Sequence, residues 1–272
     1  MLKLFIILFV SFSVQAKVVD LKKYQTPVKD QKDRNTCAYF AVTALVEGVI
    51  SEKFNKKFDI SEEFQIFYGK DHFNEYADKE FGNTSMIAKN FISQSFIMKE
   101  KDFPYKPFPF DAGKVCEGED PYSTATPAHC FSGAPVEFSY DQGVRVNGLT
   151  YDWITGMWDF GKTQSQLIQK RIDKGRPVVL TLKVYPPGWD NTHVEYTDET
   201  NAKCETGEYE CYGHAILLTG YDTEKKIFMF KNSWGKSWGD QGYGTMSFDY
   251  VNNYSDSPVS VYFDKLMGEI RE

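Results

Sequence analysis

The apolar positions predict a buried helix early in the chain. Residues 38–50 are almost all apolar and rich in alanine, which is typical of a helix that is buried on every side. Asn35 or Thr36 stands where a helix cap is expected, so Cys37 is predicted to lie in the first turn. Further helices are predicted near residues 61–68, 84–98 and 164–174.

Two apolar segments in the second half of the chain predict a β-hairpin. They are residues 213–221 and 226–232, and the polar residues between them suit a turn. If the turn centres on Thr223, antiparallel partners have numbers that add to 446, and His214 faces Asn232. An asparagine in that place can fix the tautomer and orientation of the imidazole.

The composition is that of a folded globular protein. The chain has 272 residues, of which 42% are hydrophobic, and it contains 22 Phe and 17 Tyr. This is enough apolar material for a large core, which excludes disordered, collagen-like and coiled-coil proteins. The net charge is −7 and there is no basic block, so we expect neither a nucleic-acid partner nor an anionic membrane surface.

The N-terminus has the pattern of an export signal. Lys3 precedes an apolar run over residues 4–10, and residues 14–16 (Val-Gln-Ala) match a cleavage site. We therefore expect a signal peptide at 1–16 and a secreted or periplasmic protein; a buried N-terminal strand is the alternative. No other stretch approaches the roughly 20 apolar residues of a membrane span.

Export changes the expectation for the five cysteines. In an oxidising compartment cysteines pair, and an odd number leaves one thiol. Proximity suggests the pairs Cys116–Cys130 and Cys204–Cys211, although four cysteines allow three connectivities. Cys37 is then the free thiol, and a helix N-terminus favours its thiolate. An inert buried cysteine is the alternative.

Of the four histidines, only His214 lies in a predicted strand. A zinc site made of Cys204, Cys211 and His214 is a competing idea, but their spacing matches no common zinc pattern. We therefore expect neither a metal nor a cofactor. The other three histidines are expected at the surface: His72, His129 and His193.

Several motifs together resemble the papain-like cysteine peptidases. Gln31 stands six residues before Cys37, as a glutamine does in that family. Residues 232–243 (Asn-Ser-Trp-Gly-Lys-Ser-Trp-Gly-Asp-Gln-Gly-Tyr) match the family signature in full. Residues 60–63 (Ile-Ser-Glu-Glu) and 103–105 (Phe-Pro-Tyr) are similar to two further family motifs.

The resemblance implies a role for each matching residue. Cys37 would attack the scissile carbonyl, and His214 would move the proton. Asn232 would orient the ring, and Trp234 would shield that hydrogen bond from water. Gln31 would donate its side-chain amide to the oxyanion. Gly82 resembles the glycine whose backbone binds extended substrate, although residues 81–84 keep only part of that motif.

The resemblance also implies an α+β fold with two lobes, the papain-like fold. We expect a helical lobe that carries Cys37 and a β-rich lobe, from Val178 onward, that carries His214 and Asn232. The cleft between them would hold a thiolate–imidazolium pair. One papain-like peptidase domain would cover residues 17–272, without internal repeats.

The sequence departs from the family pattern at several points. Arg34 replaces a cysteine, so a disulfide that is common in the family is absent, and Ala38 replaces an aromatic residue. These residues around Cys37 most resemble those of bacterial family members, and the sequence is expected to lack a long propeptide. His214 lies 177 residues after Cys37, beyond the family's spacing of about 130–150.

The surplus length predicts an insertion at about 104–161. It contains residues 144–151, where Asn147-Gly148 suits a two-residue hairpin turn. The insertion could form a partner surface or be a surface embellishment.

The functional hypothesis is an exported, monomeric cysteine peptidase that acts on protein or peptide substrates through an acyl-enzyme. Two alternatives use the same fold. One is a cell-wall peptide hydrolase or transpeptidase. The other is a catalytically weak or inactive papain-like protein that binds peptides.

Overall fold

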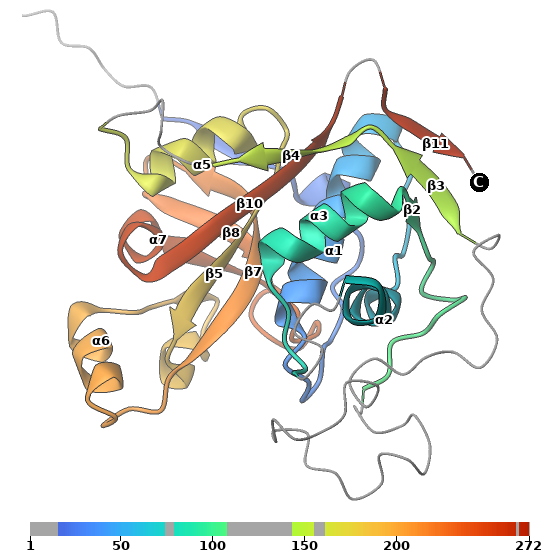
Figure 1. Ribbon diagram of the computed structural model, residues 1–272. Coiled ribbons are helices and arrows are strands. Elements are labelled where there is room, and N and C mark those ends of the chain that lie inside the picture. The colour runs from blue at the N-terminus through green and yellow to red at the C-terminus, as the bar shows by residue number, and fades with distance from the viewer. Residues whose placement is uncertain (1–15, 74–78, 108–142, 155–160, 265–266, 272) are drawn as a thin grey trace, which may run out of the picture.

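The computed structural model describes residues 16–73, 79–107, 143–154, 161–264 and 267–271, and in it helices lie on both sides of a large sheet (Figure 1). This arrangement confirms the expected two-lobed α+β fold. Residues 1–15, Cys116, Cys130, His129 and most of the expected insertion lie outside the described residues. The described helices are α1 (Cys37–Phe54), α2 (Glu62–Phe73), α3 (Thr84–Gln94), α5 (Gln164–Ile172), α6 (Asp198–Glu205) and α7 (Phe248–Tyr254), with the short 3₁₀ helices η1 (Lys22–Tyr24) and η5 (Pro186–Trp189).

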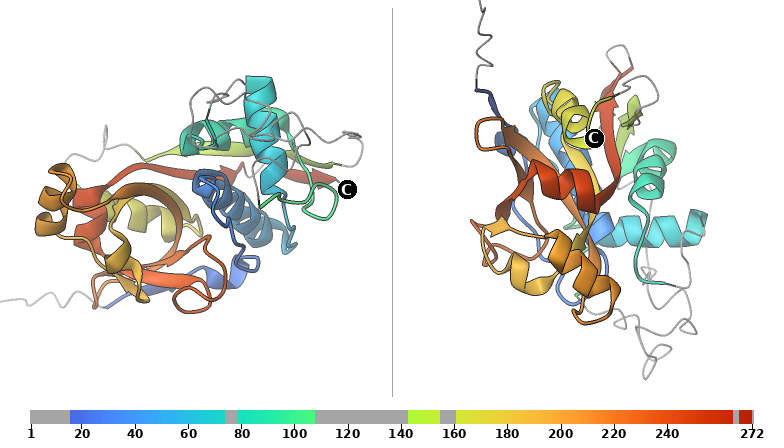
Figure 2. Two further views of the ribbon diagram at one scale, coloured as in Figure 1. Left: turned by 90° about the horizontal axis from the view of Figure 1, so that it is seen from below. Right: turned by 90° about the vertical axis from the view of Figure 1, so that its left-hand side faces the viewer.

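The main sheet has the strand order β4-β10-β5-β7-β8-β9-β6, and β1 pairs with β7 off this path. Figure 2 shows that the sheet is strongly curved. A smaller sheet has the order β11-β3-β2. The strands are β1 (Val18–Asp20), β2 (Phe96–Ile97), β3 (Val144–Asn147), β4 (Leu149–Trp153), β5 (Val178–Val184), β6 (His193–Val194), β7 (Tyr212–Asp222), β8 (Ile227–Lys231), β9 (Tyr243–Ser247), β10 (Ser255–Phe263) and β11 (Glu269–Arg271).

Helix α1 is buried from Ala38 to Ser51, which explains its nearly continuous apolar sequence. It packs against β7, β10 and α3. Thr36 stands at the cap position, but its side chain makes no capping hydrogen bond. Its hydroxyl instead pairs with the Tyr105 hydroxyl at 2.8 Å. Cys37 therefore opens the helix as predicted, while the predicted side-chain cap is wrong.

The central strand β7 is buried on both faces. Leu217 belongs to the core cluster around α1, whereas Ile216 and Leu218 belong to a second cluster that contains Trp189 and Tyr250. Successive side chains of a strand point to opposite faces. Because both faces are covered, the strand is apolar at nearly every position rather than alternating.

The predicted register of the β7–β8 hairpin is wrong. Leu217 pairs with Lys231, and the register shifts at Thr219, so that Tyr221 pairs with Phe228. The pairs next to the turn already add to 449 rather than 446, because the turn is centred between Glu224 and Lys225 and not on Thr223. The irregularity at Thr219 then changes the sum to 448. Asn232 lies just beyond the end of β8.

The hairpin predicted around Asn147-Gly148 is also wrong. β3 pairs with β2 and β11, whereas β4 pairs with β10, so the two strands do not pair with each other. Gly148 has a φ of +79°, and a side chain there would collide with the Met267 carbonyl oxygen. The glycine thus allows one chain segment to bend from the main sheet into the small sheet.

Two predicted helices form, but their ends differ from the predicted ones. α3 ends at Gln94 rather than near residue 98, because Ser95 adopts a left-handed conformation and a short strand follows. α5 spans most of the predicted residues 164–174, and Thr163 and Gln166 form a capping box at its start.

Among the residues that the structure describes, no helix combines the length and apolarity that crossing a membrane requires.

Candidate active site

The site lies where the start of α1 meets the start of β7. A cleft of about 450 Å³ separates these elements. Five of the six site residues expected from the sequence line it, and the sixth, Asn232, is buried and bonded to His214. The five that line the cleft are Gln31, Cys37, Gly82, His214 and Trp234.

The orientation of the imidazole follows from its hydrogen bonds. His214 Nε2 lies 2.8 Å from Asn232 Oδ1, and the same oxygen accepts the backbone N–H of Ser233 at 2.8 Å. An atom that accepts a backbone N–H must be the amide oxygen, so Nε2 is the protonated nitrogen. Nδ1 is then left as the basic nitrogen of the neutral ring.

Two tryptophans enclose this hydrogen bond. Trp234 stacks on the His214 ring with centroids 4.6 Å apart, and Trp189 meets the ring edge-on at 5.7 Å. Trp189 is almost fully buried, and its indole N–H donates to the Tyr250 hydroxyl. Trp234 was expected from the sequence, whereas Trp189 was missed because its neighbours form an irregular, proline-rich segment.

Burial acts against charge on both reactive groups. It lowers the pKa of His214 to about 4, and the hydrogen bond to Asn232 opposes this effect only in part. Burial also raises the pKa of the Cys37 thiol, and backbone groups of Ala215, Ala38 and Cys37 itself counteract it only partly. Each charge is therefore unfavourable alone, so an ion pair here depends on both charges forming together.

The loop before α1 is fixed to the segment after β8. Gln31 N donates to the Ser233 carbonyl at 2.8 Å, and Gly235 N donates to the Lys29 carbonyl at 3.1 Å. The Gln31 side chain accepts from the Ser233 hydroxyl and donates from Nε2 to the Arg34 carbonyl at 2.7 Å. An amide nitrogen carries two hydrogens, so one remains for a ligand in the cleft.

Gly82 lines the cleft, and the packing around it leaves no room for a side chain. A side chain there would come within 2.7 Å of the Tyr39 ring and 2.9 Å of Ile87 Cδ1. The glycine is therefore required by packing against α1 and α3. Phe81 beside it is 44% exposed and also lines the cleft.

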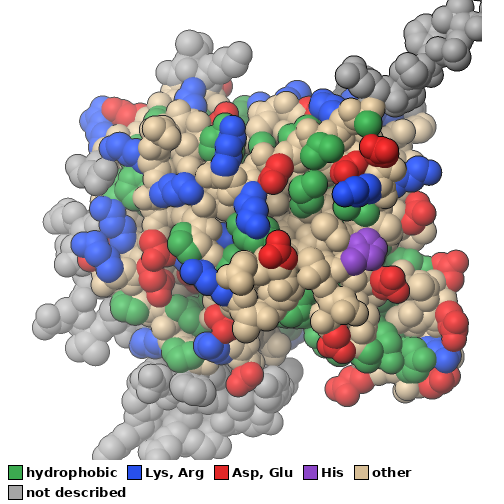
Figure 3. All heavy atoms as spheres, turned by 180° about the vertical axis from the view of Figure 1, so that it is seen from behind, with side chains coloured by type: hydrophobic (Ala, Val, Ile, Leu, Met, Phe, Trp, Pro, Cys, Tyr) green, Lys and Arg blue, Asp and Glu red, His purple; other side chains and the backbone are tan. Residues whose placement is uncertain are grey.

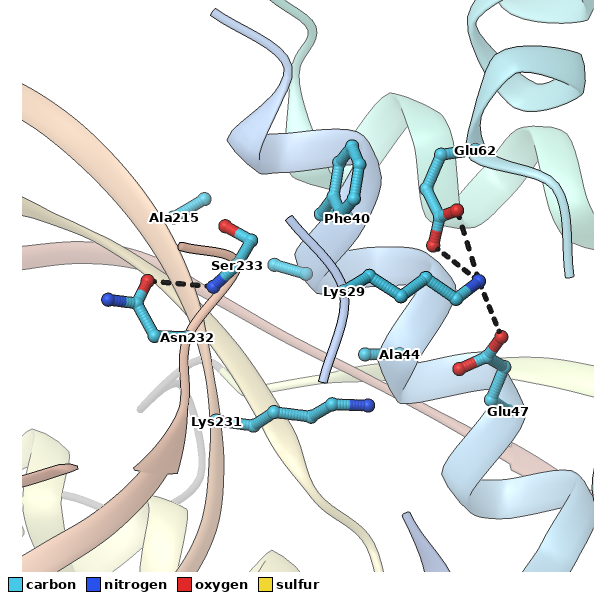
Figure 4. A pocket seen from close by; sticks show the side chains of 10 residues that line it. Lys29, Phe40, Ala44, Glu47, Glu62, Ala215, Lys231, Asn232 and Ser233 are labelled. Atoms are coloured by element: carbon cyan, nitrogen blue, oxygen red, sulfur yellow. Dashed lines mark hydrogen bonds and ion pairs between the residues drawn. The ribbon is translucent and has the colours of Figure 1, made fainter. Parts of the chain in front are cut away.

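A cluster of buried charges lies behind the site (Figure 4). Lys29 Nζ lies 3.1 Å from Glu47 Oε1 and 2.9 Å from Glu62 Oε1, and both carboxylates are almost fully buried. These residues line a cavity of about 20 Å³, the size of one water molecule, together with Lys231 and Asn232. The cluster was missed, although Glu47 in an otherwise apolar helix was a signal for it.

The polar segment after β5 is held by the expected disulfide. Cys204 at the end of α6 is bonded to Cys211, next to β7, so their sulfurs are paired rather than available to a metal. Tyr185 stacks on Tyr209 beside it, with centroids 4.4 Å apart. In Figure 3, acidic side chains predominate on the lobe at lower right, which carries α6.

Comparison with known proteins identifies the chain's family. The family model described as "Papain family cysteine protease" matches residues 15–261. The chain belongs to the papain family. Its likeness to solved papain-family structures extends over the fold: xylellain, a cysteine protease from Xylella fastidiosa, has a TM-score of 0.61 at 22% identity, covering 91% of this chain and 86% of that one. Procathepsin L 3 of Tenebrio molitor has a TM-score of 0.60 at 20% identity, covering 94% and 72%.

Curated relatives are similar over most of this chain. The chain is 26% identical to the gamete and mating-type specific protein A of Dictyostelium discoideum over 83% of its own length and 41% of the relative's. It is 25% identical to cysteine proteinase 3 of Entamoeba histolytica, covering 86% and 63%, and 25% identical to human cathepsin O, covering 89% and 64%. The chain thus spans about two fifths to two thirds of the length of these papain-family relatives.

Proposed function

We propose that this protein is an exported cysteine peptidase that hydrolyses peptide bonds through a thiolate–imidazolium pair and an acyl-enzyme. The observation that carries this proposal is the His214–Asn232 hydrogen bond under Trp234, in the cleft that also exposes Cys37. The bond presents Nδ1 as a base, and the nucleophile lies in the first turn of the facing helix.

The chemistry follows from this geometry. The Cys37 thiol gives its proton to Nδ1 of His214, and its sulfur attacks the scissile carbonyl carbon. His214 then returns the proton to the leaving amine, which leaves a thioester on Cys37. A water molecule, deprotonated by the same nitrogen, hydrolyses the thioester and releases the carboxylic acid. The site needs no metal or other cofactor for these steps.

The oxyanion formed at each step needs hydrogen-bond donors. We assign this role to the Gln31 amide and the backbone N–H of Cys37. The tight hold on Gln31 by Ser233 and Arg34 supports the assignment, because a preorganised donor loses no entropy during the reaction. Gly82 and Trp234 would contact the bound substrate.

We also propose export, with the signal peptide at 1–16 and a mature peptidase domain at 17–272. The Cys204–Cys211 disulfide supports a secreted or periplasmic location. Arg34 and Thr36 before the nucleophile support a place among bacterial family members that lack a long propeptide. We propose a monomer, in which the 104–161 insertion offers a partner surface.

Purified protein and its Cys37→Ser variant would be incubated with an unstructured protein such as casein, and released amines would be measured. We expect release by the wild type alone, and a covalent adduct at Cys37 with a peptidyl electrophile. Fragments from peptidoglycan but none from casein would instead favour a cell-wall hydrolase. Peptide binding without an adduct or product would favour an inactive binding protein.

A further inference from the structure

We propose that a buried ionic cluster, the Arg34 clasp, positions the oxyanion loop against the substrate-binding segment. The clasp consists of Arg34, Glu63 and Glu80. Arg34 lies in the loop before Cys37, Glu63 lies on α2, and Glu80 lies two residues before Gly82. The proposal rests on the proposed peptidase function, because it assigns the clasp a part in presenting substrate to that site.

The clasp is almost fully buried, and its ion pairs are also hydrogen bonds from defined atoms of the guanidinium. The side chain of Arg34 is 1% exposed, and those of Glu63 and Glu80 are 2% and 4% exposed. Arg34 Nε donates to Glu80 Oε1 at 2.9 Å, and one Nη donates to Glu63 Oε2 at 2.5 Å. The same Nη also donates to the Lys106 carbonyl at 2.7 Å. The planar guanidinium thus holds three elements at fixed angles.

Glu80 accepts two hydrogen bonds from the loop before α1. Its Oε1 accepts from the Arg34 side chain, and its Oε2 accepts the backbone N–H of Asn35 at 2.7 Å. The Arg34 carbonyl in turn accepts from Gln31 Nε2. A continuous chain of hydrogen bonds therefore runs from Glu80, through Arg34, to the amide assigned to the oxyanion. Glu80 is linked through Phe81 to Gly82, and Phe81 and Gly82 both line the cleft.

Tyr105 reinforces the same loop. Its ring lies under the Arg34 guanidinium at 5.0 Å, and its hydroxyl donates to the Gln31 carbonyl at 2.9 Å. The hydroxyl also pairs with Thr36, directly before the nucleophile. The guanidinium, Tyr105 and Glu80 thus constrain the loop from both ends.

Stability alone is a poor explanation for this cluster. Buried ion pairs are commonly no more stabilising than well-packed apolar side chains, because desolvation offsets their attraction. Burial raises the pKa of Glu63 against the opposing effect of Arg34, which shows that this cost is present here. The clasp instead fixes the position of the loop before Cys37 relative to α2 and to the segment that leads to Gly82. Arg34 also stands where the resemblance would place one cysteine of a common disulfide. Unlike that disulfide, the clasp is not broken by reductants.

The test compares two variants that each remove one carboxylate from the same guanidinium. Glu80→Gln leaves a single acceptor oxygen for two donors, Arg34 and Asn35, and turns an NH₂ group toward one of them. Glu63→Gln removes a charge on the α2 side and leaves the bonds of Glu80 to the loop intact. Both variants should lose thermal stability. Only Glu80→Gln should lose substrate positioning.

The readout is the reaction of Cys37 with two electrophiles. Iodoacetamide needs only the thiol, whereas a peptidyl chloromethyl ketone also needs the Gly82 segment and the oxyanion donors. We expect Glu80→Gln to lower the ratio of the peptidyl rate to the iodoacetamide rate by about 10- to 100-fold, because small misplacements of reacting groups have effects of this size. Glu63→Gln should change the ratio by less than about 3-fold. The kcat for a peptide substrate should follow the same order.

A milder variant covers the case in which Glu80→Gln does not fold. Glu80→Asp keeps the charge but is one methylene shorter, so it cannot reach both donors, and its ratio should also fall. An unchanged ratio in a folded Glu80 variant, or equal losses in the Glu80 and Glu63 variants, would overturn the clasp as a positioning device. If the wild type hydrolyses no peptide but the ratio still falls, the clasp stands and the proposed peptidase function fails.

Discussion

The charge state of His214 can be tested by the dependence of stability on pH. Cys37→Ser removes the thiol, prevents self-digestion and keeps the shape of the side chain. Neither burial nor the Asn232 hydrogen bond, the two causes acting on the pKa of His214, involves the thiol. In this variant the imidazole should therefore titrate alone, with its pKa still lowered from 6.5 to about 4.

The sign and size of the effect follow from linkage. Between pH 6.5 and pH 4 the unfolded chain holds a proton on His214 that the folded protein does not. Stability therefore falls as the pH falls through this window, and below pH 4 the loss is complete. A difference between 6.5 and about 4 corresponds to roughly 3 kcal/mol, at about 1.4 kcal/mol for each pH unit.

Urea unfolding of Cys37→Ser and of Cys37→Ser/His214→Gln would be followed from pH 7 to pH 4. Other groups titrate equally in both proteins, so the difference between the two curves isolates His214. We expect the single variant to lose about 3 kcal/mol more than the double variant over this range. NMR titration of the ring supplies an independent pKa.

Parallel curves, or a ring pKa near 6.5, would refute the inference that Trp234 and Trp189 keep water from this hydrogen bond. The wild type offers a further comparison. If Cys37 raises the ring pKa above that of the serine variant, the thiolate–imidazolium pair exists in the resting enzyme. If it does not, the proton moves only when substrate is attacked.

Three further substitutions test other parts of the site. Asn232→Ala should lower kcat less than His214→Ala, because Asn232 orients the ring and breaks no bond; an equal loss in a folded variant would contradict this role. Gln31→Ala should lower peptide turnover by about 10²–10³ while iodoacetamide still labels Cys37 at nearly the original rate, and unchanged turnover would remove Gln31 from the site. Lys29→Met should cost about 3–5 kcal/mol in urea unfolding at pH 7, because it leaves Glu47 and Glu62 buried without their shared cation. A loss below about 1 kcal/mol would contradict this role for Lys29.

Local patterns predicted the parts of the site that depend on local structure. The apolar run after Cys37 predicted the correct helix. The apolar segment 226–232 placed Asn232, at its end, next to His214. The register argument behind the second prediction was wrong, yet the 2.8 Å hydrogen bond forms. It forms because Asn232 lies beyond the end of β8, where the chain is no longer bound by the ladder.

Long-range contacts were beyond such reasoning. Asn147-Gly148 has the chemistry of a tight turn, but its flanking strands each find a better partner far away in the sequence. The Arg34 clasp likewise joins Arg34 to Glu63, 29 positions away, and to Glu80, 46 positions away. A buried arginine and two buried glutamates look like surface residues in a sequence, because only the fold brings their charges together.

The position of β10 has a consequence for biosynthesis. Among the strands of the main sheet it comes last in the sequence, yet it lies between β4 and β5 and also packs against α1 and α3. During translation, the edge of β5 and one side of α1 therefore stay uncovered until residues 255–263 have left the ribosome. A ribosome stalled before that point would display an open sheet edge, a ready target for chaperones.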